Sequence, residues 1–211
     1  DRAGFAGADG PTHHGAYDIA YMRCLPNLVV SAPMNEIELR NLMYTATEYQ
    51  GPFAIRYPRG QGVLPDWQKP MQAIEIGKGR EIKEGEDLAI LTIGHIGNYA
   101  SEVISRLADE DIHAGQYDMR FVKPLDEDLL HRIFSRYSQV ITVEDGCLMG
   151  GFGSAILEFM ADHGYSCKVV RLGIPDRIVE HGEQLELHAE CGFDVEGIYK
   201  TALQMLDPVR V

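Results

Sequence analysis

The sequence has no apolar run close to the length that a membrane-spanning helix needs, about 18 residues. Basic residues are also scarce, because 19 Lys and Arg stand against 32 Asp and Glu, for a formal net charge of −13. A strongly acidic chain is repelled by nucleic-acid backbones and by anionic lipid surfaces. We therefore expect neither a membrane nor a nucleic acid as a partner.

Cysteine is sparse as well. The four cysteines are scattered and include no CxxC pair: Cys24, Cys147, Cys167 and Cys191. This pattern favours free thiols in a reducing compartment over a disulfide or zinc framework, so a cytoplasmic protein is expected. His181 and His188 lie seven positions apart, which is not a usual metal-ligand spacing, and no metal site is expected in this chain.

Against this acidic background, two loops that carry arginines stand out. Residues 1–15 combine Arg2, Asp9 and the pair His13-His14 with many small or loop-forming residues, and residues 56–60 form a second cationic loop around Pro58. A guanidinium group binds phosphate oxygens in bidentate fashion. Together the two loops predict the wall of a site for a small, phosphorylated and hydroxylated substrate.

The first part of the chain reads as one βαβ piece. A helix is expected to begin near Ala16, and residues 28–32 and 53–57 read as buried strands. Between them, Asn35 with Glu38 three positions later predicts a helix cap. Short connections between strand, helix and strand imply a parallel pair.

The rest of the chain alternates strands and helices, which predicts a second, complete, doubly wound α/β domain. The expected strands are 77–84 (an edge strand), 88–93, 113–119, 140–143 and 169–172, and the expected helices are 97–109, 126–135, 153–163, 183–191 and 195–206. Residues 60–75 are rich in Gly, Pro and polar groups and hold the single Trp. We place the first domain at 1–65, a linker at 66–75 and the second domain at 76–211.

Several motifs resemble a known family. Residues 1–4 (DRAG), 9–15 (DGPTHHG), 21–27 and 57–60 are similar to the 1-deoxy-D-xylulose-5-phosphate synthase family, which belongs to the transketolase-like, thiamine-diphosphate-dependent superfamily. The second domain adds motifs that resemble the superfamily's C-terminal domain more generally, at 120–126, 143–146 and 150–153. The resemblance runs along essentially the whole chain.

This resemblance implies that the chain is the last third of such a synthase, namely the end of its pyrimidine-binding domain and its C-terminal domain. The family condenses pyruvate with glyceraldehyde 3-phosphate to 1-deoxy-D-xylulose 5-phosphate and CO2, a step towards isoprenoids and thiamine, and a homodimer is expected. Thiamine diphosphate and Mg²⁺ would serve the full-length enzyme. Neither is expected on this fragment, because the GDG…N motif and the glutamate that activates the cofactor are missing. The fragment alone is therefore expected to be inactive.

The resemblance also assigns roles to single residues. Arg2 and Arg59 match the family's phosphate-binding arginines. Asp9 would accept a hydrogen bond from the acceptor's hydroxyl, and His13 would orient that substrate and could shuttle a proton. His14 is expected to be structural.

Other residues suggest structural roles. Asp9-Gly10 followed by Asn35 imitates a metal motif, but Asn35 is better explained as the helix cap. Arg56 is a weaker candidate for the phosphate site than Arg2 and Arg59, and the alternative is a pair with an acidic residue across the sheet.

In the second domain, the Gly-rich loop 150–154 indicates close strand–helix packing rather than dinucleotide binding. Glu144 and Asp145 are expected to cap that loop, and Asp126 is expected to cap a helix. In the first domain, Tyr21 and Tyr57 are expected to pack with bonded hydroxyl groups.

Two other readings remain open. The chain could belong to another member of the superfamily, such as the β subunit of a 2-oxo acid dehydrogenase, which would need a lipoyl-domain partner. The paired Arg2 and Arg59 argue against this reading. Alternatively, residues 76–211 could form only a dimerisation or regulatory module, because their motifs show no convergent cluster of titratable groups.

Overall fold

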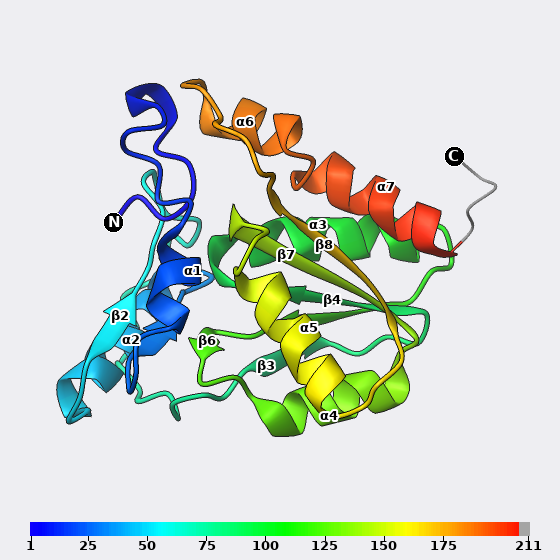
Figure 1. Ribbon diagram of the computed structural model, residues 1–211, viewed down its shortest axis with the longest axis horizontal. Helices are drawn as coiled ribbons and strands as arrows, with labels where there is room; N and C mark the ends of the chain where they lie inside the picture. Colours follow the sequence, from blue (N-terminus) through cyan, green and yellow to red (C-terminus); the bar gives the residue numbers. More distant parts are fainter. Residues whose placement is uncertain (207–211) are drawn as a thin grey trace.

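The computed structural model describes residues 1–206, which form an α/β fold with two sheets (Figure 1). The elements of the first part are η1 (Gly7–Asp9), α1 (Asp18–Arg23), β1 (Val29–Ser31), α2 (Glu36–Glu48) and β2 (Phe53–Ile55). The elements of the second part are β3 (Arg80–Lys83), β4 (Leu88–Thr92), η2 (Gly94–Ile96), α3 (Gly97–Ala108), β5 (Ala114–Asp118), β6 (Phe121–Lys123), α4 (Glu127–Arg136), β7 (Gln139–Cys147), α5 (Phe152–Asp162), β8 (Lys168–Ile174), α6 (Gln184–Glu190) and α7 (Val195–Leu206). The last five residues of the expected second domain lie outside the described part.

The larger sheet has the strand order β3-β5-β4-β7-β8. All of its neighbouring strands are parallel except β3, which runs antiparallel to β5 at one edge. The expected edge strand and the expected doubly wound pattern are both confirmed. The chain adds β5 on one side of β4 and β7 on the other, so the sheet grows outward from β4 in both directions.

Side chains of the central strand alternate between the two faces of this sheet. Leu88 and Ile90 join a core with α3 and α7, whereas Ala89 and Leu91 join a core with α4 and α5. Figure 1 shows these two helix pairs on opposite sides of the sheet. Because successive side chains of a strand point to opposite faces, a strand covered on both faces is buried throughout, as β4 is, and its residues are apolar up to Thr92.

The smaller sheet joins the two parts of the chain. Its order is β2-β1-β6, with β1 parallel to β2 and antiparallel to β6. Strand β6 belongs to the second part of the sequence and was not predicted, because it is only three residues long and stands next to the turn at Pro124. Its Phe121 is fully buried beside Val29 and Leu42 of the first part. The two parts therefore share a sheet and a core.

The segment between β2 and β3 contains no helix or strand. It runs along α2, where the Arg40 guanidinium donates to the carbonyls of Trp67 and Lys69 at 3.0 and 2.6 Å. Further along, the backbone N–H of Ile74 donates to Thr45 Oγ1 at 2.8 Å. The connection is therefore bound to α2 by several hydrogen bonds.

The expected helix caps are confirmed. Asn35 Oδ1 accepts from the backbone N–H of Glu38 at 3.1 Å at the start of α2. Asp126 Oδ1 accepts from the backbone N–H of Leu129 at 3.0 Å at the start of α4. None of the helices in the described residues is both long and apolar enough to span a bilayer.

Candidate functional site

Residues 1–15, here called the N-terminal loop, are closed at their base by backbone hydrogen bonds. The N–H of Gly15 donates to the carbonyls of Arg2 and Gly4 at 3.0 and 2.8 Å, and the N–H of Gly4 donates to Gly15 at 3.1 Å. The N–H of Ala3 donates to the carbonyl of Tyr57 at 2.9 Å, so the base of this loop lies against the segment that carries Arg59. The two arginine-bearing loops of the sequence are therefore neighbours in space.

Two of the expected site residues meet directly. The Arg59 guanidinium forms an ion pair with the Asp9 carboxylate, and both side chains are partly exposed. Arg2 occupies the left-handed region with φ of 64°, and its Nε lies 3.5 Å from Asp1 Oδ1. The convergence of Arg2 and Arg59 on one phosphate stays a prediction.

The two histidines of the loop have different environments. His13 is exposed, and its Nδ1 lies 2.9 Å from Thr12 Oγ1. The Nδ1 of His14 accepts from the backbone N–H of Ala6 at 3.0 Å, and its ring contacts Phe5 edge-on. His14 therefore stabilises the loop, as expected, while His13 is accessible to a ligand.

The expectation for Tyr21 and Tyr57 was wrong. Tyr21 is 57% exposed and Tyr57 is 38% exposed, so neither side chain is packed in the core. Tyr21 lies on α1, whose buried position is taken by Ile19, and Tyr57 follows β2 in a segment outside any helix or strand. Their rings are left at the surface.

Sequence reasoning missed a buried ionic network beneath the loop. The Arg56 guanidinium bonds Asp18 Oδ2 through Nε at 3.0 Å, the carbonyl of Gly15 at 3.0 Å, and the Asp145 carboxylate. The alternative for Arg56, a pair with an acidic residue, is thus confirmed. The expectation that Asp145 caps the Gly-rich loop was wrong, since its carboxylate faces Arg56 and His95 instead.

Burial and charge shift the pKa values in this network. Burial lowers the pKa of His95, and the nearby Asp145 carboxylate opposes this only in part. Burial alone would raise the pKa of Asp145, but Arg56 and His95 outweigh it and lower the pKa below its usual value. Burial also lowers the pKa of His188 to about 4. At neutral pH the network therefore contains an ionised Asp145–Arg56 pair beside neutral imidazoles.

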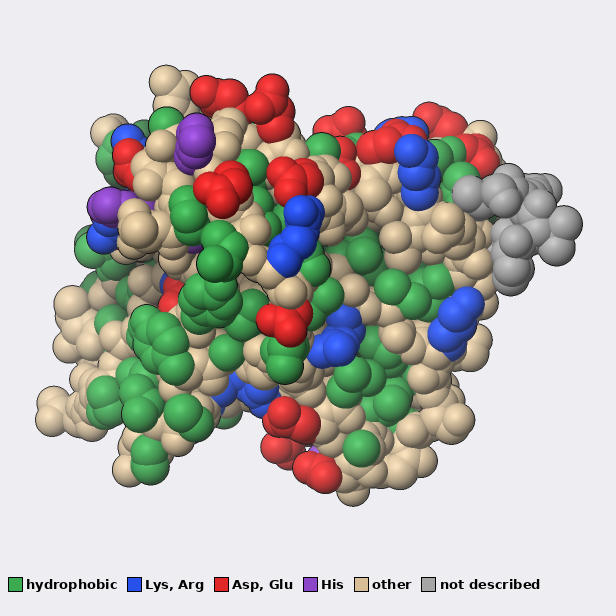
Figure 2. All heavy atoms as spheres, turned by 45° about the horizontal axis from the view of Figure 1, so that its top comes forward, with side chains coloured by type: hydrophobic (Ala, Val, Ile, Leu, Met, Phe, Trp, Pro, Cys, Tyr) green, Lys and Arg blue, Asp and Glu red, His purple; other side chains and the backbone are tan. Residues whose placement is uncertain are grey.

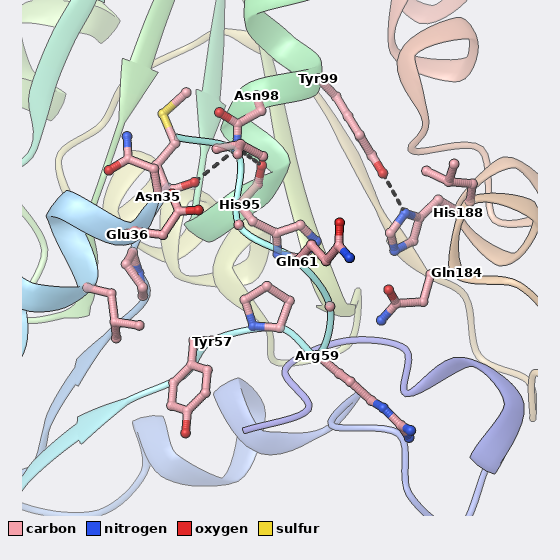
Figure 3. Close-up of a pocket in the computed structure, with 18 residues that line it drawn as sticks. Asn35, Glu36, Tyr57, Arg59, Gln61, His95, Asn98, Tyr99, Gln184 and His188 are labelled. Atoms are coloured by element: carbon pink, nitrogen blue, oxygen red, sulfur yellow. Dashed lines mark hydrogen bonds between the residues drawn. The ribbon is translucent and has the colours of Figure 1, made fainter. Parts of the chain in front are cut away.

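A pocket of about 410 Å³ opens next to this network, between the first and second parts of the chain (Figure 3). Its polar wall includes Gln61, His95 and Tyr99, and the Tyr99 hydroxyl lies 2.9 Å from His188 Nδ1. Arg59 stands at the rim, and Figure 3 shows its guanidinium directed away from the pocket. Among the four expected site residues, only Arg59 lines this pocket.

The Gly-rich loop after β7 has the structural role that was expected. The Glu144 carboxylate accepts from the backbone N–H groups of Phe152 and Gly153 at 2.7 and 2.8 Å. Burial raises the pKa of Glu144 to about 7, although these two hydrogen bonds act in the opposite direction. The free N–H groups at the start of α5 are thus occupied by a side chain of the protein itself.

Residues 1–206 contain no group of three or more His, Cys, Asp or Glu side chains that could bind a metal ion. All four cysteines are free thiols. Near the pocket, the buried Glu144 carboxylate accepts from the backbone N–H groups of Phe152 and Gly153. The buried Asp145 carboxylate forms an ion pair with Arg56.

The α/β fold of both parts agrees with that of the transketolases, whose domain models and solved structures match this chain. The chain belongs to this family: residues 77–198 match the model described as transketolase, C-terminal domain, and residues 1–63 match transketolase, pyrimidine binding domain.

Its curated relatives give the narrower resemblance. The chain is 66% identical over 203 residues to the 1-deoxy-D-xylulose-5-phosphate synthase of Cytophaga hutchinsonii. The aligned region covers 95% of the chain and 32% of that relative. The protein of the same name from Phocaeicola vulgatus is 58% identical, over 96% of the chain and 32% of that relative. The one from Aquifex aeolicus is 48% identical, over 100% of the chain and 33% of that relative. The resemblance seen in the motifs is confirmed. The chain spans about a third of the length of these relatives.

Solved structures agree on the fold. A protein described as a split gene transketolase, inactive beta4 tetramer, superposes with a TM-score of 0.81 at 30% identity, over 95% of this chain and 64% of that one. The transketolase of Campylobacter jejuni superposes with a TM-score of 0.66 at 20% identity, over 94% of this chain and 29% of that one. The second likeness concerns the fold alone.

Proposed function

We propose that this chain is the acceptor-binding and C-terminal part of a synthase that condenses pyruvate with glyceraldehyde 3-phosphate to 1-deoxy-D-xylulose 5-phosphate and CO2. The observation that carries the proposal is the 66% identity, over 95% of the chain, to a relative with that name. The contact between the Asp9 and Arg59 loops supports it, since it brings a cation and a hydroxyl-binding group together. The product would serve isoprenoid and thiamine biosynthesis in the cytoplasm.

In this proposal, the two arginines bind the phosphate of the acceptor. The Arg59 charge is balanced by Asp9, and both side chains are accessible to solvent. A phosphate dianion would compete for the guanidinium, because phosphate accepts two parallel N–H bonds from it. The Asp9 carboxylate would then be free to accept a hydrogen bond from the acceptor's hydroxyl.

His13 is proposed to move the proton in the same site. Its ring is exposed on the N-terminal loop, four positions from Asp9, and its only described partner is a hydroxyl group. An imidazole titrates near neutral pH, so it can donate a proton to the carbonyl oxygen of the acceptor as the carbon–carbon bond forms. Both ring nitrogens of His14 have partners, Nδ1 in the N–H of Ala6 at 3.0 Å and Nε2 in the carbonyl of Glu180 at 3.4 Å, so His14 is proposed to stay structural.

Thiamine diphosphate and Mg²⁺ are proposed as cofactors of the longer protein, where they would supply the chemistry that decarboxylates pyruvate. No residue of 1–206 is assigned to either of them. We accordingly propose that the chain by itself makes no product. The description of its split-gene structural relative as an inactive beta4 tetramer supports this proposal.

A homodimer is proposed for the longer protein. Large apolar side chains are exposed on the first part of the chain, among them Tyr17, Tyr21 and Met43. Figure 2 shows hydrophobic side chains gathered on the side of the molecule that this part forms. Exposed apolar surface of this kind is typical of an interface between subunits.

The test is the variant Arg59→Ala in the complete synthase. The loss of a charge-assisted contact should raise KM for glyceraldehyde 3-phosphate roughly 10- to 100-fold and change KM for pyruvate little. Non-phosphorylated glyceraldehyde, used as the acceptor, should be turned over equally well by the variant and the wild type.

Arg136→Ala is the matched control, since this arginine is exposed on α4, where it makes a 3.7 Å ion pair with Glu84 and lies over the ring of Tyr137. Equal changes in KM for both substrates after Arg59→Ala would contradict the proposal and favour a 2-oxo acid dehydrogenase subunit. Product formed by the 211-residue chain alone, with both substrates, cofactor and Mg²⁺, would contradict the proposed inactivity.

A further inference from the structure

The second part of the chain contacts the N-terminal loop at both its base and its tip. The base contains Gly4 and Gly15, and the tip contains the short helix η1, which ends at Asp9. Arg2, Asp9 and His13 are carried on this loop. Whatever fixes the loop also fixes the three groups, and the contacts come from strand β7 and from the region around α6.

At the base, Arg56 links the loop to strand β7. Its guanidinium donates to the carbonyl of Gly15 at 3.0 Å and to the carboxylate of Asp145, and it is almost fully buried. The same carbonyl of Gly15 accepts from Gly4. The position of Gly15, which closes the loop, is thus set by a guanidinium whose orientation depends on Asp145.

Asp145 also contacts the loop directly. A Cβ atom on Gly4 would lie only 2.7 Å from Asp145 Oδ2, so the carboxylate touches the backbone of the loop. The same oxygen lies 3.3 Å from His95 Nδ1, and among residues 1–206 it has no hydrogen-bond partner. Two positions further along β7, the N–H of Cys147 donates to the carbonyl of Ala16 at 2.7 Å.

At the tip, the N–H of Gly182 just before α6 donates to the carbonyl of Gly7 at 3.4 Å. Nearer the base, Gln184 of α6 donates through Nε2 to the carbonyl of Phe5. The Phe5 ring is 1% exposed and stacks on Phe193, with 6.0 Å between ring centroids, and lies 5.8 Å from the ring of His188. The loop is therefore packed into the core of the second part rather than lying free on its surface.

We propose that Asp145 is a positioning residue for the acceptor-binding loop, acting through Arg56 and through its contact with Gly4. This inference rests on the proposed function and assigns to the second part of the chain a role beyond dimerisation. The Asp145 side chain is fully buried against Arg56, so it would act on the site through its neighbours. Its carboxylate fixes the closure of the loop, and thereby the placement of Arg2, Asp9 and His13 relative to Arg59.

The first experiment is Asp145→Asn in the complete synthase. The amide keeps the shape but loses the charge that orients Arg56, so KM for glyceraldehyde 3-phosphate should rise roughly tenfold, because small misplacements of binding groups are costly. KM for pyruvate should stay within about twofold of the wild type. Gln184→Ala removes the hydrogen bond from α6 to the carbonyl of Phe5. It should raise KM for glyceraldehyde 3-phosphate in the same selective way, but by less.

The matched control is Asp118→Asn. Asp118 is an equally buried carboxylate of the same sheet, paired with Arg80 at 3.0 Å and remote from the loop. The Asp118→Asn variant should lower the stability of the protein without a selective change in KM for glyceraldehyde 3-phosphate. If Asp145→Asn changes both KM values equally, or behaves like Asp118→Asn, the positioning role is overturned.

A second readout does not depend on the reaction. In the 211-residue chain, Asp145→Asn should speed amide hydrogen exchange at Gly4 and Gly15 at least tenfold, while exchange in α3 stays unchanged. Unchanged exchange at these two amides would overturn the inference even if the synthase reaction is established. Faster exchange combined with an Arg59→Ala variant that shows no phosphate selectivity would instead retain the positioning of the loop and overturn the proposed function.

Discussion

At the scale of single residues, the contact between Gly4 and Asp145 explains why the loop needs glycine at its base. Gly4 has φ of +70° and lies against the carboxylate, so any side chain there would be strained twice, by its backbone conformation and by a clash. Arg56 is equally constrained, because its guanidinium bonds three separate partners within the core. Removing one member of such a buried pair typically costs about 3–5 kcal/mol.

His188 gives a pH-dependent prediction at this scale. Burial lowers its pKa to about 4, so between pH 4 and its ordinary value near 6.5 the unfolded chain binds a proton that the folded chain does not. Stability is therefore lost as the pH falls through this window, by up to about 1.4 kcal/mol per pH unit. We expect His188→Gln to flatten this dependence, measured by urea unfolding at a series of pH values.

The control is His113→Gln, because His113 is well exposed near the start of β5 and should leave the slope unchanged. A His188→Gln variant with the same slope as the wild type between pH 6.5 and 4 would refute the prediction.

At the scale of elements, helix caps show how a side chain can serve more than one element. Asn35 caps α2 alone, whereas Asp126 caps α4 and also accepts from the backbone N–H of Gly79 at 3.0 Å. Gly79 directly precedes the edge strand β3. Asp126 therefore couples the start of a helix to the start of a strand.

This difference predicts unequal losses of stability. Asn35→Ala removes one cap bond and should cost about 1 kcal/mol, the usual value for a cap. Asp126→Ala also leaves the partly buried N–H of Gly79 without its partner, and should cost about 2–3 kcal/mol. Urea unfolding of both variants checks the order, with Asp126→Asn as the variant that retains an acceptor. Equal losses would show that the Gly79 bond contributes nothing.

At the scale of the whole molecule, three kinds of contact join the two parts of the chain. Strand β6 pairs with β1, Arg56 pairs with Asp145, and the Glu38 carboxylate of α2 accepts from Arg120 at 2.7 and 3.0 Å. All of these contacts are buried or nearly so. They are of the kind that binds elements of one cooperative unit rather than two independent domains.

We therefore expect the 211-residue chain to unfold in a single transition. The fluorescence of Trp67, which lies over Arg40 of α2, reports on the first part, while far-UV circular dichroism reports mainly on the helices of the second part. The two midpoints in urea should coincide, and Glu38→Gln should lower both together. Two separated midpoints would mean that the parts unfold independently.

The fold of the second part was predictable from local signals. The apolar run at 88–91, the amphipathic helix at 97–108 and the cap at Asp126 each depend on neighbours within a few residues. Strand β6 was missed because its partner β1 lies about ninety positions earlier in the chain. In addition, three residues are too few to show the alternation of apolar and polar side chains that identifies a strand. The candidate site residues came from loop motifs, and their roles remain predictions.

The sequence by itself determined the family, the α/β order of elements and the two arginine loops. Motifs, the periodic spacing of apolar side chains and helix caps each depend on only a few neighbouring residues. Only the tertiary structure decided that Asp145 faces Arg56 instead of capping a loop, and that Asp9 pairs with Arg59. Arg56 and Asp145 are 89 positions apart. Contacts between residues so far apart in the sequence depend on how the strands pack. A buried charge pairs with the groups that this packing brings within reach.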